Sequence, residues 1–168
     1  VAQKTTLYGK DLTGEKQLPL LLHELCKIEG IEWIRLLYCY PEEITDELIK
    51  VIKTEEKVCN YIDMPIQHSE NRILQRMGRR TSREDLVAVI KKLRKEIPDI
   101  TIRTTLITGF PGESQEDHEG LMNFVEECQF DRLGVFTYSP EEDTLAATFE
   151  DQIDDCLLYT SDAADEAR

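Results

Sequence analysis

The chain has 168 residues, of which 40% are hydrophobic and 32% charged, and its net charge at pH 7 is −14. No apolar run approaches the roughly 20 residues of a membrane span, and no signal peptide precedes the first elements, so we expect a cytoplasmic protein that contacts no membrane. The acidic balance favours a solvated surface or a basic protein partner, and direct binding to nucleic acid is not expected because phosphate contacts need clustered lysines and arginines.

The first half of the chain alternates helical and strand-like patterns. Helical segments carry apolar residues three and four positions apart, whereas strand-like segments are apolar and aromatic. Thr45 is placed to cap one helix, since two acidic residues follow it in the first turn. In chain order we expect a helix over 17–28, a buried strand over 31–40, the helix after Thr45, a strand over 58–66 and a short helix over 69–77.

The second half continues the alternation. Thr81 to Glu84 indicates a capping box before the clearest helix, and Ser114 with Asp117 indicates a second cap. We expect a helix over 82–97, a strand over 100–108, a helix over 114–128 and a strand over 132–138. Repeated strand–helix units with apolar strands predict a parallel sheet covered by helices. The functional residues of such sheets follow the carboxyl ends of the strands.

Polar residues occur at two of the expected strands. Gln67 and His68 end one strand and can hydrogen-bond a ligand; alternatively, His68 contacts the start of the next helix or is solvated in the loop. Arg103 lies inside an apolar strand, where an unpaired charge is costly. It either points into a central cavity and binds an anion or carboxylate, or reaches water at the edge of the sheet.

The sequence GFPGE, residues 109–113, joins a strand to a helix. Gly109 and Gly112 permit positive φ and a close approach of the backbone, and the proline between them fixes the turn. Amides at the next helix start can receive polar ligand atoms, and Glu113 can accept from a ribose hydroxyl or an ammonium. A tight turn without a ligand explains the pattern equally well. Tyr138, after the last strand, either stacks on a ring or belongs to the core.

Side chains for acid–base or metal catalysis are not grouped in the sequence. Five cysteines, at positions 26, 39, 59, 128 and 156, are too far apart for a zinc or iron–sulfur spacing. We expect them to be reduced and packed. The three histidines lie in three different segments and belong to no nucleophile–base motif. No catalytic residue is therefore assigned to this chain.

Four motifs, in order, resemble the radical S-adenosylmethionine (SAM) methylthiotransferases, and within that family the RimO type. They are QKTTLYGKDL, DMPIQHSENRILQRMGRR, RTTLITGFPGES and VFTYSPEEDTLAA. The related MiaB type, which modifies transfer RNA, usually has a different second motif. Asp143 replaces the glycine that is usual in the last motif. The resemblance implies an α/β fold over residues 1–150, part of an open TIM-like (βα) barrel of the radical SAM type that lacks its first strand.

The resemblance also implies cofactors and a substrate. SAM is expected across the carboxyl rim of the barrel, with two [4Fe-4S] clusters in the full-length parent and none ligated by this chain. The cluster cysteines, including a CxxxCxxC loop, are expected upstream of Val1, and this chain alone is expected to be inactive. The residues expected at the SAM rim are Gln67, His68, Arg103, Thr105, Gly109, Gly112, Glu113 and Tyr138.

RimO-type enzymes methylthiolate the β-carbon of an aspartate in a small-subunit ribosomal protein, and they need a reducing electron donor. The alternatives are a MiaB-type transfer-RNA methylthiotransferase and a catalytically inactive (βα) domain that binds SAM or a protein. Residues 151–168 are expected to be a tail outside the domain. Within it, CLLYTSDAADE (156–166) resembles a translated sequencing adapter, the alternative being a short natural tail. A C-terminal TRAM domain, which the resemblance implies, is expected to be missing.

Overall fold

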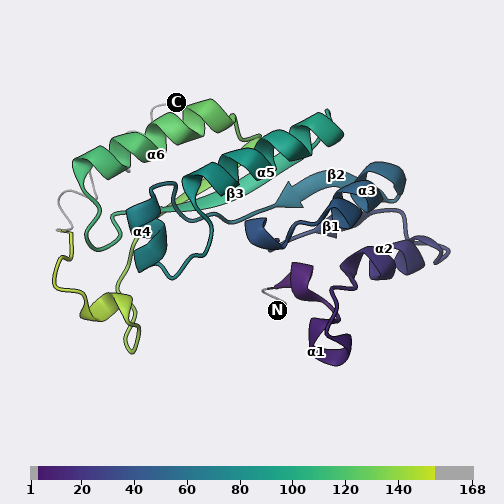
Figure 1. Ribbon diagram of the computed structural model, residues 1–168, viewed down its shortest axis with the longest axis horizontal. Helices are drawn as coiled ribbons and strands as arrows, with labels where there is room; N and C mark the ends of the chain where they lie inside the picture. Colours follow the sequence, from purple (N-terminus) through teal and green to yellow (C-terminus); the bar gives the residue numbers. More distant parts are fainter. Residues whose placement is uncertain (1–3, 154–168) are drawn as a thin grey trace.

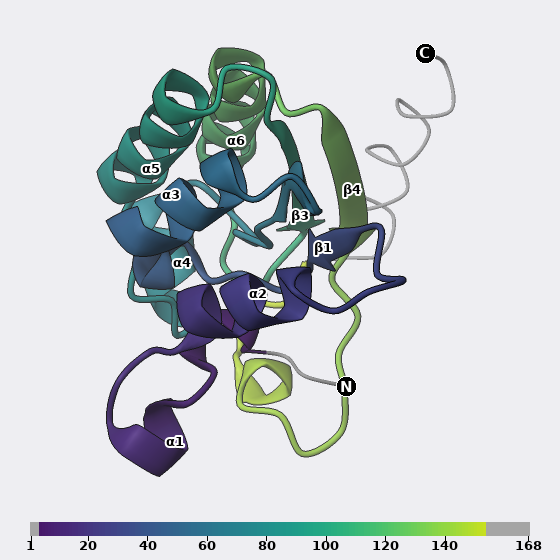
Figure 2. The same ribbon diagram turned by 90° about the vertical axis from the view of Figure 1, so that its right-hand side faces the viewer.

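The computed structural model describes residues 4–153 and contains one parallel sheet whose strand order follows the chain, β1-β2-β3-β4. The strands are β1 (Ile34–Leu36), β2 (Val58–Asp63), β3 (Thr101–Thr108) and β4 (Arg132–Thr137). Three crossover helices, α3 (Asp46–Thr54), α5 (Arg83–Glu96) and α6 (Gln115–Cys128), lie on the same side of the sheet (Figures 1 and 2). Parallel neighbours in chain order with helices on one face form an arc of a (βα) barrel, as expected.

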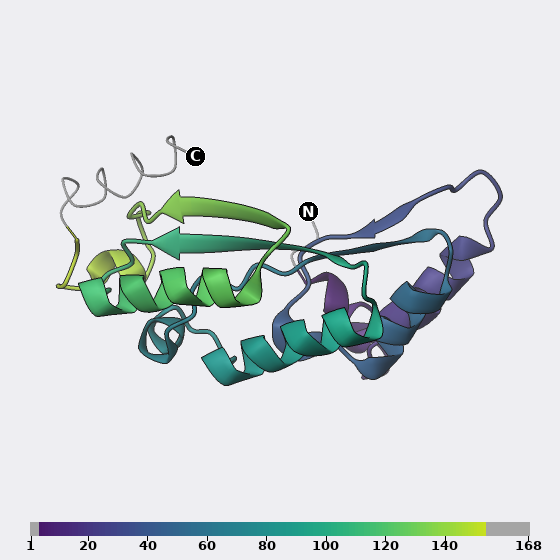
Figure 3. The same cartoon turned by 90° about the horizontal axis from the view of Figure 1, so that it is seen from above.

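Short elements lie around this arc. They are η1 (Thr5–Leu7), α1 (Lys10–Thr13), α2 (Leu18–Cys26), η2 (Pro41–Glu43), α4 (Asn71–Arg76) and η3 (Ala146–Thr148). Helix α2 packs against α3. The arrowheads of β3 and β4 point toward η3 and α4, so the carboxyl ends of these strands open onto that part of the molecule (Figures 1 and 3).

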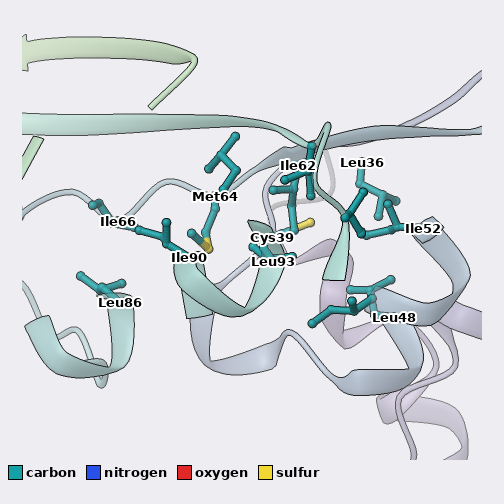
Figure 4. Packing of buried hydrophobic residues seen from close by; sticks show 14 of the residues in the cluster. Leu36, Cys39, Leu48, Ile52, Ile62, Met64, Ile66, Leu86, Ile90 and Leu93 are labelled. Atoms are coloured by element: carbon teal, nitrogen blue, oxygen red, sulfur yellow. The ribbon is translucent and has the colours of Figure 1, made fainter. Parts of the chain in front are cut away.

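The core fills the space between the helices and the sheet. Strand β3 alternates strictly, with Ile102, Thr104 and Leu106 buried, while Arg103 and Thr105 are half-buried on the opposite face. We call this opposite side the open face of the sheet. Figure 4 shows how the core side chains interlock; those labelled are Leu36, Cys39, Leu48, Ile52, Ile62, Met64, Ile66, Leu86, Ile90 and Leu93.

Most expected elements are confirmed to within a few residues. The cap of α6 is confirmed, since Ser114 and Asp117 form a reciprocal capping box. The cap of α5 was placed one residue too early. Ser82, not Thr81, is the N-cap, and its reciprocal partner is Asp85. Thr81 is buried instead.

The expectation of a long buried strand over 31–40 is wrong. Strand β1 is short, and Trp33 beside it is 80% exposed. Tyr38 adopts φ +58°, which ends the extended backbone. The reason is position: β1 pairs only with β2 within residues 4–153, and its register shifts between Ile34 and Leu36. The crossover helices lie on one side of the sheet, so they cover only one face of this strand (Figure 2).

The cysteines at 26, 39, 59 and 128 are free thiols. Burial, followed by the nearby carboxylate of Asp63, raises the pKa of Cys39 to about 12, and burial raises the pKa of Cys128 to about 11. These two packed thiols are therefore protonated at neutral pH. Cys156 and the adapter-like sequence 156–166 lie outside the described residues. Within residues 4–153, no helix is both long and apolar enough to cross a membrane.

Candidate functional site

A cavity of about 640 Å³ lies beside the carboxyl end of β3. Six of the residues that line it are Gln67, Arg79, Ile107, Phe110, Leu145 and Phe149. A second cavity of about 210 Å³ adjoins it, and Tyr40, Gln67 and Arg79 contribute to both walls. The larger cavity falls within the range of roughly 300–1,000 Å³ that is usual for small-molecule sites.

Gln67 lies at the junction of the two cavities in an unusual backbone conformation. Its φ is +73°, in the left-handed region that non-glycine residues rarely adopt. The surrounding sheet holds it there: its N–H donates to Thr105 O (2.9 Å), and its carbonyl accepts from Ile107 N–H (2.8 Å). Backbone strain that is enforced in this way is typical of functional sites.

His68 and Glu113 contact each other and belong to the lining of neither cavity. Both side chains are almost completely buried. His68 Nδ1 accepts a hydrogen bond from Glu70 N–H (3.0 Å), so the proton of the neutral ring lies on Nε2. Nε2 faces Glu113 Oε1 at 3.6 Å and has no hydrogen-bond partner among the described residues. Of the alternatives for His68, the contact with the start of the next helix is confirmed and the solvated side chain is wrong.

The carboxylate of Glu113 holds the GFPGE turn together. Its Oε2 accepts from the N–H groups of Gly109 (2.5 Å) and Phe110 (3.1 Å), and its Oε1 lies 3.1 Å from His118 Nδ1. Burial favours the neutral acid, but contacts with the imidazoles of His68 and His118 and with the Gly109 amide outweigh it. The pKa of Glu113 therefore lies below its ordinary value. In the structure, this carboxylate binds the protein's own turn.

The two glycines of the turn have the positive φ that the sequence predicts, +72° at Gly109 and +83° at Gly112. A Cβ at Gly112 would collide with the carboxylate of Asp151 and lie 3.1 Å from Arg76 Cζ. Gly112 N–H donates to Asp151 O (2.8 Å). The close approach at Gly112 is thus made by other parts of the chain.

Arg103 points to the open face from an inner strand of the sheet. Its Nη1 donates to Asp63 Oδ1 (2.6 Å), and Asp63 is buried at the end of β2. Tyr38 N–H donates to the other carboxylate oxygen (3.0 Å). The edge position in the other alternative is wrong, because β3 has neighbours on both sides, but the Arg103 side chain is 40% exposed and so does reach water. The sequence analysis missed Asp63 as the partner, since the two residues are 40 positions apart. Thr105, on the same face, lines the smaller cavity.

Tyr138 packs its ring edge-on against Phe110, with the ring centres 5.2 Å apart. Phe110 in turn contacts Phe149 in the cavity wall. The Tyr138 hydroxyl is buried without a hydrogen-bond partner among residues 4–153. Such a hydroxyl usually finds a partner, so it remains available to a ligand or to another segment.

Arg79 and Tyr40 are site residues that the sequence analysis missed. The guanidinium carbon of Arg79 lies 5.2 Å from the centre of the Tyr40 ring. A local signal for Arg79 exists, because Gly78 follows α4 at φ +71° and turns the chain so that Arg79 N–H donates to Leu74 O. No comparable signal marks Tyr40.

The side chains that line the larger cavity suit an organic ligand. The cavity wall combines aromatic and aliphatic side chains with an amide and guanidinium groups, which fits a ligand that carries a ring and polar ends. Among the described residues, no group of three or more histidine, cysteine or acidic side chains is arranged to hold a metal ion.

Comparison with known proteins places these features in a family. The model of the radical SAM superfamily matches residues 2–125. The ribosomal protein uS12 methylthiotransferase RimO of Lachnoclostridium phytofermentans is 66% identical over 153 residues, and that of Clostridium perfringens is 59% identical over 155 residues. These alignments cover 91% and 92% of the chain, respectively, and 35% of each relative. The chain thus spans about a third of the length of these curated relatives.

Solved structures agree on the fold. The chain matches the radical SAM methyltransferase TsrM from Kitasatospora setae with a TM-score of 0.63 at 16% identity, over 82% of this chain and 26% of that one. It matches SuiB from Streptococcus suis with a TM-score of 0.61 at 15% identity, over 97% of this chain and 34% of that one. At these identities the likeness concerns the fold alone.

Proposed function

Because the chain belongs to the radical SAM superfamily, we propose that it is part of a RimO-type methylthiotransferase that modifies the β-carbon of an aspartate in a small-subunit ribosomal protein. The observation that carries this proposal is the 56–66% identity, over about nine-tenths of the chain, to relatives that all bear that name. The cavity at the carboxyl end of the sheet supports it, because parallel (βα) sheets bind their substrates there. A substrate on the ribosome also favours a cytoplasmic location.

SAM is the cofactor proposed for the larger cavity, and it would supply the radical chemistry needed to remove hydrogen from an unactivated carbon. The protein's part is to bind, orient and exclude water. Phe110 and Phe149 provide apolar walls, and the side chain of Gln67 provides a polar group. Thr105 and Tyr138 are proposed to complete the rim, from the smaller cavity and from beside Phe110.

The remaining expected rim residues are proposed to position the site. Glu113, supported by His68, fixes the GFPGE turn through the amides of Gly109 and Phe110. Gly112 allows that turn to approach Asp151. Arg103 is proposed to order the open face through Asp63.

The iron–sulfur clusters and the electron donor are proposed for the longer parent. The sequence contains no CxxxCxxC motif, so the two clusters are assigned to residues outside this chain. The domain of residues 1–150 is likewise a proposal, supported by the family match over residues 2–125.

A chimera tests the proposed function. The matching third of the Lachnoclostridium phytofermentans relative is replaced by residues 1–150, and the chimera is expressed in a bacterium from which both methylthiotransferase types have been deleted. Mass spectrometry of ribosomal proteins and of transfer-RNA nucleosides then reads the product. We expect a methylthiolated aspartate in the small-subunit protein. Modified transfer RNA alone would indicate the MiaB type, and SAM binding without either product would indicate an inactive domain.

A further inference from the structure

The walls of the larger cavity are positively charged although the chain carries a net charge of −14. The basic residues in its lining are Lys4, Arg76, Arg79 and Arg80, and the acidic ones are Glu42 and Glu43. Arg76 is paired with Asp151, and Glu43 is paired with Lys16. What remains is a cationic excess, which attracts an anionic group into the cavity.

Arg79 is the basic side chain best fixed for such a role. It lies at the junction of the two cavities and contributes to both walls. Its Nη2 donates to Pro65 O (3.3 Å), and its guanidinium stacks on the Tyr40 ring. Its backbone is also held, since its N–H donates to Leu74 O (2.8 Å) just after the left-handed Gly78. A guanidinium held in this way needs little further ordering when it binds a ligand.

The charge of Arg79 has no acidic counterpart within 4.0 Å among the described residues, because each of their ion pairs joins other side chains. Arg103 provides the contrast: its guanidinium is already matched by the buried Asp63. A partly buried guanidinium with donors to spare is suited to a carboxylate, which it binds through two parallel hydrogen bonds. The nearby Glu42 and the acidic surface disfavour a polyanion.

We propose that Arg79, between Tyr40 and Gln67, is the residue that binds a ligand's carboxylate in this cavity. The identity of the carboxylate rests on the proposed function, under which two ligands carry one. They are the protein substrate, through its aspartate side chain, and SAM, through its methionyl end. Arg79 lines the smaller cavity as well as the larger one, which favours the aspartate, because the smaller cavity adjoins the proposed cofactor space.

The test compares ligands that differ only in the carboxylate. In one arm the full chain is titrated with a ribosomal-protein loop peptide that contains the aspartate, and with the same peptide containing asparagine. In the other arm it is titrated with SAM and with decarboxylated SAM. Dissociation constants are measured by calorimetry for the wild type, Arg79→Gln, Arg79→Lys and Lys95→Gln. Lys95→Gln, at an exposed position of α5, is the matched control for net charge.

We expect the wild type to prefer the carboxylate ligand in the aspartate arm. Arg79→Gln should weaken binding of that ligand by about 10- to 100-fold and leave the amide ligand unaffected. The affinity of Arg79→Lys for the carboxylate ligand should lie between those of the wild type and Arg79→Gln, because lysine keeps the charge and lacks the planar guanidinium. Lys95→Gln should behave as wild type. A preference seen only in the SAM arm would assign Arg79 to the cofactor's carboxylate.

Two results would overturn the inference. One is a wild type that shows no preference in either arm, which needs no variant and so does not depend on how a variant folds. The other is an Arg79→Gln protein that keeps its native circular dichroism and also keeps the preference. The chimera assay distinguishes a failure of this inference from a failure of the proposed function. A chimera that modifies nothing, with the preference intact, would refute only the proposed function.

Discussion

Glu113 shows how one buried carboxylate organises the turn between β3 and α6. It satisfies two consecutive amides of the turn and faces two imidazoles from different segments. Glu113→Gln keeps the size of the side chain and removes its charge. We expect the free energy of unfolding to fall by roughly 1.5–3 kcal/mol near neutral pH, as for hydrogen bonds to charged groups. Urea denaturation measures this, with Glu126→Gln, at an exposed position of α6, as the control.

The same residue predicts a pH dependence. Since the folded-state pKa of Glu113 lies below its ordinary value of 4.5, the unfolded chain binds this proton more tightly than the folded one. The stabilisation is therefore complete above about pH 4.5 and is lost as the pH falls through the folded pKa. We expect the stability difference between wild type and Glu113→Gln to shrink below pH 4.5. A constant difference down to pH 3 would contradict this.

A comparison of Gly112 with Gly30 separates the cost of backbone strain from the cost of steric crowding. Gly112→Ala would place a methyl group against Asp151 and Arg76 at φ +83°. Gly30→Ala has a similar φ of +85° and nothing within 4 Å. We expect about 1–2 kcal/mol of destabilisation from the backbone at both sites, with a further loss at Gly112 only. If thermal unfolding shows the same loss of stability in both variants, the Asp151 side chain moves away from the new methyl group without a measurable cost.

At the residue scale, the sequence predicted the properties that follow from residue type better than it predicted which residues contact each other. The positive φ of Gly109 and Gly112 followed from their residue type, because glycine alone adopts it at little cost. The contacts of Arg103 with Asp63 and of Glu113 with His68 could not be predicted in this way, since the fold brings these residues together. The departure from the family pattern at Asp143 shows that the backbone conformation of this turn is kept without a glycine. Asp143 has φ +65° where the family usually has glycine, so the turn is kept at some strain.

At the scale of elements, local signals predicted helices well because caps and apolar periods act over a few residues. The cap of α5 illustrates their limit, since two overlapping four-residue patterns compete at its start. The structure selects Ser82 with Asp85 because Thr81 turns into the core. Strand β1 illustrates a second limit. Its apolar residues predicted burial, but burial requires neighbours on both faces, and sequence alone does not supply that information.

The cap of α5 gives a prediction at this scale. Ser82→Ala should cost about 1 kcal/mol of stability, as for other N-caps. Asp85→Ala should also destabilise, and the double variant should lose less than the sum, because the two side chains satisfy each other's amides. Glu84→Ala should have the smallest effect. A larger loss for Glu84→Ala than for Asp85→Ala, by urea denaturation, would favour the cap first predicted.

At the scale of the whole molecule, β4 has one neighbouring strand within residues 4–153. Phe136 on this strand is 59% exposed, and Leu133 and Val135 are also exposed. An unpaired apolar edge is a template for pairing with another chain. We expect the purified chain to self-associate as its concentration rises, and Phe136→Lys to shift it toward the monomer. Sedimentation velocity measures this, with Leu12→Lys in α1 as a control that is equally apolar and 84% exposed. An equal shift toward the monomer in both variants would indicate nonspecific hydrophobic association rather than pairing at the edge strand.

The strand order has a consequence for how the chain acquires its shape. Each strand pairs with the one that precedes it in the sequence, so no strand has to be inserted between two that are already paired. Every pairing closes a loop of one or two α-helices and their connections, which keeps the entropic cost of each step moderate. Topologies dominated by near-neighbour contacts fold faster than those that pair distant segments. A nascent chain of this design can add one unit at a time as it leaves the ribosome, each new unit docking on an edge that is already formed.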